Sequence, residues 1–424
     1  SSMNKMSDKP LRILMPSYRS HPFTGGQGIY MRLVTKAMVE LGHTVEVISG
    51  QPYPILDEGV KLTKLPSLDL YSYDSPLKAF KFKLLKEPID LYEWLSHLSG
   101  GFSEPYTFGE RMAVWGKTNY NRFDVVHDNQ TLAYGLIKLR DMGVPVVGTI
   151  HHPITMDKRI DIQHAETLSL KLLKWRWYSF LKMQIKVARK LDPIIVVSEN
   201  TRKDVVKDFK IDPKKTRKVL HGIDHKTFEP IPSIKRKKNQ LITTASADVP
   251  LKGQKYLLEA LAEVRNQYPN VHLELVGKQR EGSTTAETLD ELGLSDIVNF
   301  NQGISYEELV NLLASASVAI VPSLYEGFSI PAIEALSCGA PLIATTGGAL
   351  PEVAGPHLET CLAVPPGDSS ALAKQIEFAF ENPDICQRVG LAGRQRVIEK
   401  WSWRESAITT AKHCEELLAN WNIG

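Results

Sequence analysis

Cysteine and long apolar runs are scarce in this sequence. Its 424 residues include four cysteines, and no two of them form a CxxC pair: they are Cys338, Cys361, Cys386 and Cys414. This spacing argues against a structural zinc site and against a disulfide scaffold. No stretch reaches the roughly 18 uninterrupted apolar residues of a membrane-spanning helix, and the first residues lack the apolar core of a signal peptide. We therefore expect a cytoplasmic protein.

An excess of charge of one sign is missing as well. The 51 Lys and Arg residues and the 48 Asp and Glu residues leave a net charge of +3, and no zinc-finger or RNP-type signature occurs. We therefore expect no nucleic-acid partner. Hydrophobic residues make up 43% and charged residues 23%, as in ordinary globular proteins. A chain of this length exceeds what one hydrophobic core usually serves, which indicates two domains.

Short runs rich in β-branched residues alternate with helix-like stretches along the first half of the chain. The runs cover residues 11–18, 44–50, 123–128, 145–152 and 193–199. This alternation predicts an α/β fold in which a doubly wound parallel sheet is covered by helices on both faces. Ligands of such sheets bind outside the C-terminal ends of the strands, so functional residues should lie in the loops that follow the strands.

A change of composition divides the chain. Residues 225–240, HKTFEPIPSIKRKKNQ, combine two prolines with a cluster of basic residues, as linkers do. We expect one Rossmann-like domain in residues 1–228 and a second in residues 229–402, where the alternation restarts, with a cleft between them. Residues 403–424 read as a terminal helix that packs back on the first domain.

Two loops of the first domain hold candidate residues. Gly25 and Gly26 lie in TGGQG, between the first strand and a helix, where backbone amides could cradle a phosphate. Met31 stands where the dinucleotide fingerprint needs glycine, so a nicotinamide cofactor loses support, and a plain turn is the alternative. His151 ends a buried-type strand, where a histidine could donate to a developing negative charge. A structural histidine is the alternative there.

The second domain offers a lysine and two carboxylates. Lys252 lies in the loop after the first strand of this domain, just before a helix. At that position a lysine could bind an anion that approaches the start of the helix. A solvated surface lysine is the alternative. The segment YEGFSIPAIEALSCG places Glu326 in the exit loop of a strand and Glu334 in the next helix. The amides of residues 327–329 would face an anion at the start of that helix. A glycosidase acid and nucleophile, or a surface pair, are the alternatives for the two carboxylates.

The segment YEGFSIPAIEALSCG resembles the E-x7-E signature of the retaining nucleotide-sugar glycosyltransferases of family four, which have the GT-B fold of two Rossmann-like domains. The resemblance covers nearly the whole chain, because further segments follow in that family's order: the glycines of TGGQG, TIHH near His151, VVSENTRKDV from Val196, HGID from His221, PLKG at Lys252 and the closing WSW. It implies metal-independent transfer of a hexose from a nucleotide-sugar to a hydroxyl acceptor. The first domain would bind the acceptor and the second the donor.

The resemblance also implies roles for individual residues. Glu334 would accept hydrogen bonds from the ribose of the donor, and Glu326 would contact hydroxyls of the transferred sugar. Lys252 would hold the donor pyrophosphate, and His151 would lie beside the reaction centre. The implied catalytic residues are His151, Glu326 and Lys252, and the implied donor-binding residues are Gly25, Gly26, Gly327, Phe328, Ser329 and Glu334.

Two positions depart from the family's pattern. Ala247 stands five residues before Lys252, where the family often has arginine, and His221 stands where many members have asparagine. Ala247 suggests a non-catalytic nucleotide-sugar-binding protein as an alternative. A phosphorylase or disaccharide synthase of the same fold is a further alternative. The donor would be linked to UDP or GDP and would be a substrate, so we expect no cofactor.

Residues 169–190 mix basic with aromatic side chains on what reads as one helix. Such a helix suits contact with a membrane surface, which would fit a lipid-linked acceptor. A helix packed on the domain core, with its lysines in water, is the alternative. A soluble sugar or a small metabolite is the alternative acceptor.

Overall fold

The chain forms two compact units. The computed structural model describes residues 9–20, 27–244, 249–277 and 283–421. One unit comprises Ser1–Val197, Thr201–Val219 and Trp403–Gly424, and the other comprises Ser198–Asn200 and Leu220–Ser402. Residues 225–240 thus lie within the second unit. There the guanidinium of Arg236 donates to the carbonyl oxygens of Leu313 and Ala316, both at 2.8 Å.

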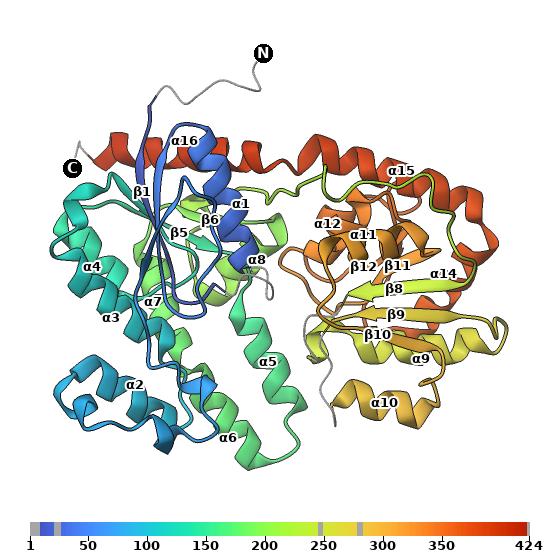
Figure 1. The fold of residues 1–424 in the computed structure, drawn as a ribbon, viewed down its shortest axis with the longest axis horizontal. Helices are drawn as coiled ribbons and strands as arrows, with labels where there is room; N and C mark the ends of the chain where they lie inside the picture. Colours follow the sequence, from blue (N-terminus) through green and yellow to red (C-terminus); the bar gives the residue numbers. More distant parts are fainter. Residues whose placement is uncertain (1–8, 21–26, 245–248, 278–282, 422–424) are drawn as a thin grey trace. The chain divides into compact units, whose positions relative to one another are not determined.

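The first unit is built on a seven-stranded parallel sheet (Figure 1). The strands are β1 (Arg12–Ser17), β2 (Thr44–Ser49), β3 (Lys61–Lys64), β4 (Val125–His127), β5 (Val146–Ile150), β6 (Ile194–Val196) and β7 (Thr216–Lys218). Their spatial order is β3-β2-β1-β4-β5-β6-β7, so the direction of winding reverses between β1 and β4.

Helices cover both faces of this sheet. The helices of this unit are α1 (Gln27–Glu40), α2 (Pro88–Leu98), α3 (Glu104–Gly116), α4 (Tyr134–Met142), α5 (Ile154–His164), α6 (Leu168–Trp177), α7 (Leu181–Lys190), α8 (Glu199–Phe209) and α16 (Trp403–Trp421). Successive side chains of β1 point to opposite faces. Ile13 therefore packs in a cluster with Met31 of α1 and Ala407 of α16, whereas Leu14 packs with Met112 of α3 and Leu136 of α4.

The second unit repeats the plan with six parallel strands in the order β10-β9-β8-β11-β12-β13, and its winding reverses between β8 and β11. The strands are β8 (Gln240–Thr244), β9 (His272–Val276), β10 (Val298–Asn301), β11 (Val318–Val321), β12 (Leu342–Thr345) and β13 (Leu362–Val364). The helices are α9 (Gln254–Arg265), α10 (Thr284–Leu292), α11 (Tyr306–Ser315), α12 (Ile330–Ser337), α13 (Leu350–Ala354), α14 (Ser369–Glu381) and α15 (Pro383–Lys400). Two Rossmann-like α/β units are thereby confirmed.

One expected element is wrong. Residues 169–190 do not form a single helix, because a 3-10 turn at Tyr178–Phe180 separates α6 from α7. Helix α7 buries Leu181, Met183 and Val187 among other side chains, whereas α6 buries none. Within the described ranges, no helix is both long and apolar enough to cross a membrane.

Candidate functional site

The sheet of the second unit brings two of the candidate loops together. Ligands of doubly wound sheets bind where the strand order reverses, outside the C-terminal ends of the two strands concerned. In this unit those strands are β8 and β11. Lys252 lies in the loop after β8, in the short 3-10 turn Pro250–Lys252, and Glu326 lies in the loop after β11. The topology therefore places both residues at the expected binding edge.

Lys252 and Glu326 form an ion pair there. The Lys252 Nζ atom donates to Glu326 Oε1 at 3.0 Å and to Oε2 at 3.2 Å, and the Ser323 hydroxyl donates to Oε1 at 2.7 Å. Glu326 is buried, while 29% of the Lys252 side chain is exposed. The carboxylate is thus fixed by two donors, and the ammonium keeps an open side for a further anion.

Glycines let three loops meet around this pair. At Gly253 φ is +69°, and a Cβ atom would lie 2.0 Å from the carbonyl oxygen of Pro322. At Gly348 φ is +60°, and a Cβ atom would lie 2.4 Å from the carbonyl oxygen of Glu326. Only glycine fits either position, because a side chain would clash and favour another backbone conformation. The PLKG and TTGG segments are therefore both in backbone contact with the loop after β11.

The exit loop of β11 leads into α12, which carries Glu334. Ser329 caps this helix, because its side chain accepts a hydrogen bond from the backbone N–H of Ala332 at 3.2 Å. In the described part of the chain, the buried Oε2 atom of Glu334 has no hydrogen-bond partner. Burial raises the pKa of Glu334 to about 8. One oxygen of this carboxyl group is thus available to bind a hydroxyl of a ligand.

Residues remote in the sequence hold the loop between the two glutamates. The Ser198 hydroxyl donates to the carbonyl oxygen of Gly327 at 3.2 Å, and this directs the next amide away from Ser198. The Phe328 ring packs against His221, with ring centroids 4.6 Å apart, and against Trp401 at 5.5 Å. Burial lowers the pKa of His221 to about 3, so this imidazole is neutral near pH 7.

If the loop after β11 binds the nucleotide-sugar donor expected from the sequence, replacing Ser198 with alanine should weaken that binding about threefold to tenfold, as expected for one hydrogen bond that orients a binding group. The Gly327–Phe328 peptide would lose the contact that fixes its direction. Calorimetric titration with the donor measures the effect. Ser315→Ala is a matched control, because the Ser315 hydroxyl also donates to a carbonyl at 3.2 Å, on α11. Equal affinities for all three proteins would contradict the role of Ser198.

In the first unit, His151 follows β5 and is held by two neighbouring side chains. Its Nε2 atom bonds Asn129 Oδ1, and its backbone N–H donates to Gln130 Oε1 at 2.7 Å. The Tyr30 ring meets the His151 ring edge-on, with centroids 4.5 Å apart. Asn129 and Gln130 follow β4, so the polar run after that strand positions the histidine. The sequence signal for this arrangement is the polar run DNQT directly after a buried strand, and the roles of Asn129 and Gln130 were not predicted from it.

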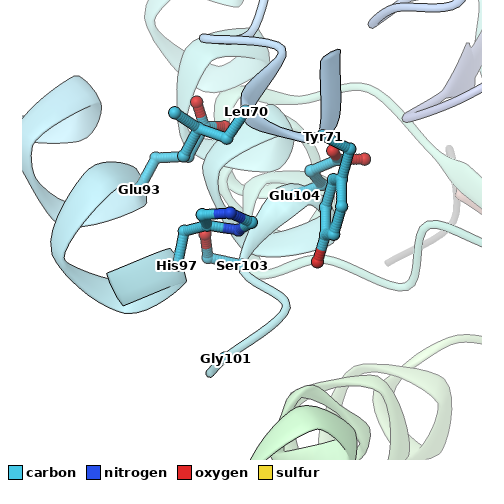
Figure 2. A pocket seen from close by; sticks show the side chains of 7 residues that line it. All are labelled: Leu70, Tyr71, Glu93, His97, Gly101, Ser103 and Glu104. Carbon is cyan, nitrogen blue, oxygen red and sulfur yellow. The ribbon is translucent and has the colours of Figure 1, made fainter. Parts of the chain in front are cut away.

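A second polar cluster in the first unit surrounds Glu104, at the start of α3. Its carboxylate pairs with Arg19, which follows β1, at 3.2 Å, and burial raises the pKa of Glu104 to about 7. Figure 2 shows Glu104, Tyr71 and His97 among the residues that line a cavity here. Its volume is about 10 Å³. Such a space holds about one water molecule, so no sugar fits in it.

The structure locates most of the predicted site residues. Lys252, Glu326 and residues 327–329 come together, Glu334 follows on α12, and His151 belongs to the other unit. Gly25, Gly26 and Ala247 lie outside the described residues. Across the described ranges, no group of three or more His, Cys, Asp or Glu side chains could hold a metal ion. The contributions of Ser323, Ser198, Asn129 and Gln130 were not predicted.

Comparisons with known proteins give a consistent result. The model of Glycosyltransferase Family 4 matches residues 24–227, and that of Glycosyl transferases group 1 matches residues 226–396. An MMP α-(1→4)-mannosyltransferase from Mycolicibacterium hassiacum is 44% identical over 410 residues, which are 96% of this chain and 99% of that protein.

Two further proteins extend the comparison. A GDP-mannose-dependent monoacylated α-(1-6)-phosphatidylinositol monomannoside mannosyltransferase from Corynebacterium glutamicum is 30% identical over 51% of this chain and 60% of that protein. The solved structure of sucrose-phosphate synthase from Thermosynechococcus elongatus has the same fold, with a TM-score of 0.74 and 23% identity over 97% of this chain and 100% of that one. The chain therefore belongs to the GT-B glycosyltransferases that join a Family 4 domain to a group 1 domain.

Proposed function

We propose that this glycosyltransferase transfers mannose, with retention of the α configuration, from a nucleotide-sugar to a hydroxyl group of a carbohydrate acceptor. The observation that carries the proposal is the 44% identity, over nearly the whole chain, to a protein named an α-(1→4)-mannosyltransferase. We further propose GDP-mannose as the donor, because a second relative is named as GDP-mannose-dependent. A UDP-linked hexose is the alternative donor.

The second unit would bind the donor. In this proposal the pyrophosphate lies at the start of α12, between Lys252 and the backbone amides of residues 327–329, since a helix N-terminus and a lysine both favour an anion. Glu326 accepts hydrogen bonds from hydroxyls of the mannose, and Glu334 accepts them from the ribose. The unpartnered, buried Oε2 atom of Glu334 supports this assignment, because a ribose hydroxyl would satisfy it.

The proposed reaction needs no metal ion and no cofactor. The bond between C1 of the mannose and the phosphate oxygen breaks, and its electron pair leaves with that oxygen. The acceptor oxygen bonds to C1 on the same face, and its proton passes to the departing phosphate. Lys252 and the loop amides stabilise the charge that develops on the phosphate. His151 would lie beside the reaction centre, and Gly25 and Gly26 would let their loop approach the phosphate and the acceptor.

Product analysis tests this function. The protein is incubated with GDP-mannose, UDP-glucose or ADP-glucose and with mannose oligosaccharides that have a free 4-hydroxyl group, either soluble or lipid-linked, in the presence of EDTA. We expect an α-linked mannoside from GDP-mannose alone, identified by NMR. A β-linked product would overturn retention, and transfer that depends on added metal would overturn metal independence.

The same experiment separates the alternative functions. Saturable donor binding without transfer to any acceptor would indicate a nucleotide-sugar-binding protein. Formation of a sugar 1-phosphate from an oligosaccharide and orthophosphate would indicate a phosphorylase. Transfer to the lipid-linked but not to the soluble acceptor, or the reverse, would identify the acceptor class.

A further inference from the structure

Two segments of the first unit have an unusual composition. Residues 75–86, SPLKAFKFKLLK, contain four lysines, and residues 168–177, LSLKLLKWRW, contain two lysines and one arginine. Neither segment contains Asp or Glu. Because the whole chain has a net charge of +3 and these segments carry seven positive charges, the rest of the chain has a net charge of −4.

The large apolar side chains of both segments are mostly exposed. Phe82 is 82% exposed, Leu77 67%, Leu168 74% and Leu172 61%. No residue of α6 is fully buried: Trp177 at its end packs against a core cluster, whereas the leucines before it stay exposed. Soluble proteins seldom leave so many neighbouring apolar side chains in water unless the surface contacts a partner.

Helix α2 joins the two segments into one surface. Arg176 of α6 donates to the Ser99 hydroxyl at the end of α2 at 3.0 Å, and a Cβ atom on Gly100 would lie 3.7 Å from Leu173. On the other side, the Trp94 indole N–H of α2 donates to the carbonyl oxygen of Pro76 at 2.9 Å. The exposed side chains of α2 continue the apolar surface: Tyr92, Leu95 and Leu98. Figure 1 shows α2 and α6 at the same end of this unit.

The charges of this surface decide what can cover it. Lys78 lies 3.7 Å from Asp74 and Lys174 lies 3.9 Å from Asp161. Among the described residues, the other four lysines of the two segments have no acidic partner within salt-bridge distance. A second copy of the chain would bring seven further positive charges against the same surface, and like charges repel. Lysines interleaved with exposed leucine and phenylalanine are instead complementary to anionic lipid headgroups and the acyl boundary beneath them.

We propose that residues 75–86 and 168–177, together with the exposed side of α2, form a docking surface for an anionic lipid membrane. The apolar side chains enter the interface, and the lysines contact the headgroups. The surface differs from the one expected from sequence, because α7 is packed in the core of its unit and residues 75–86 take its place. The proposal does not depend on which sugar the enzyme transfers.

Cosedimentation of the purified protein with vesicles tests the proposal. We expect binding to vesicles of mixed phosphatidylglycerol and phosphatidylcholine and none to phosphatidylcholine alone. Each basic residue near an anionic surface contributes about fivefold to binding, so Lys81→Gln/Lys83→Gln should lower the partition coefficient about 30-fold. Phe82→Gln/Leu172→Gln should also reduce binding, and both pairs are exposed enough for the fold to persist.

Matched controls use exposed residues of the second unit. Lys374→Gln/Lys400→Gln removes two lysines, and Leu391→Gln replaces a leucine that is 59% exposed; both variants should bind vesicles as the wild type does. Equal binding to neutral and anionic vesicles, no binding, or an equal loss in the controls would overturn the proposal. So would a dimer in sedimentation velocity that Phe82→Gln dissociates, because a second copy would then cover the surface.

Discussion

Replacing Glu326 with glutamine should lower kcat/KM for sugar transfer about 100-fold, the loss expected when a group that holds the reacting sugar in position is weakened. The amide keeps the shape of the side chain but loses the charge that pairs with Lys252 at 3.0 and 3.2 Å. Lys252 then has no carboxylate beside it, so the affinity for the pyrophosphate should not fall. We therefore expect the loss in kcat rather than in the KM for the donor, measured by initial rates over a range of donor concentrations.

Glu274→Gln is the matched control for this prediction. Glu274 is another buried glutamate of the second unit, on β9, and it accepts hydrogen bonds from Asn299 at 2.9 Å and from Asn301 at 2.6 Å. Its replacement disrupts a similar buried network of hydrogen bonds. Because Glu274 lies outside the loops after β8 and β11, kcat should stay close to that of the wild type. Similar rates for both variants would contradict the role of Glu326.

The sequence predicted the central strands well and the edge strands poorly, for a physical reason. Central parallel strands are buried on both faces and therefore appear as continuous apolar runs, as β11 (VAIV) does. Strands β3, β7 and β13 lie at sheet edges and have three or four residues each. In β3, KLTK, every side chain is at least partly exposed, so no apolar run marks it. None of these three strands was predicted.

The candidate site shows the same limit. Lys252, Glu326 and Glu334 could be selected because each follows a recognisable strand and turn. The hydrogen bond from Ser198 to Gly327 joins residues 129 positions apart, and that from the His151 backbone N–H to Gln130 spans 21. No local pattern encodes such contacts, because they depend on which strands become neighbours in the folded sheet. The sequence thus identifies groups that can react, while the fold determines what orients them.

Glu334 should make the stability of the protein depend on pH. Its pKa is raised to about 8 by burial, whereas an unfolded glutamate titrates at about 4.3. Between these pH values the folded protein keeps a proton that the unfolded chain has released, so stability falls as the pH rises. Glu334→Gln removes this dependence. Its melting temperature should exceed that of the wild type near pH 8 and approach it near pH 4. Thermal unfolding across this range tests this, and parallel curves would contradict it.

The same carboxyl group should couple donor binding to proton release. Below about pH 8 the free protein holds Glu334 protonated, whereas in the proposed donor complex the ribose hydroxyls would donate to the carboxylate. Donor affinity should therefore rise about tenfold per pH unit towards pH 8 and then level off. Calorimetry in buffers of different ionisation enthalpy should detect about one proton released per donor bound. Glu334→Gln should bind the donor weakly and without this slope, while Glu274→Gln should keep it. Wild-type binding without proton release would mean that the protonated carboxyl donates to the ligand, and the ribose would then accept from Glu334.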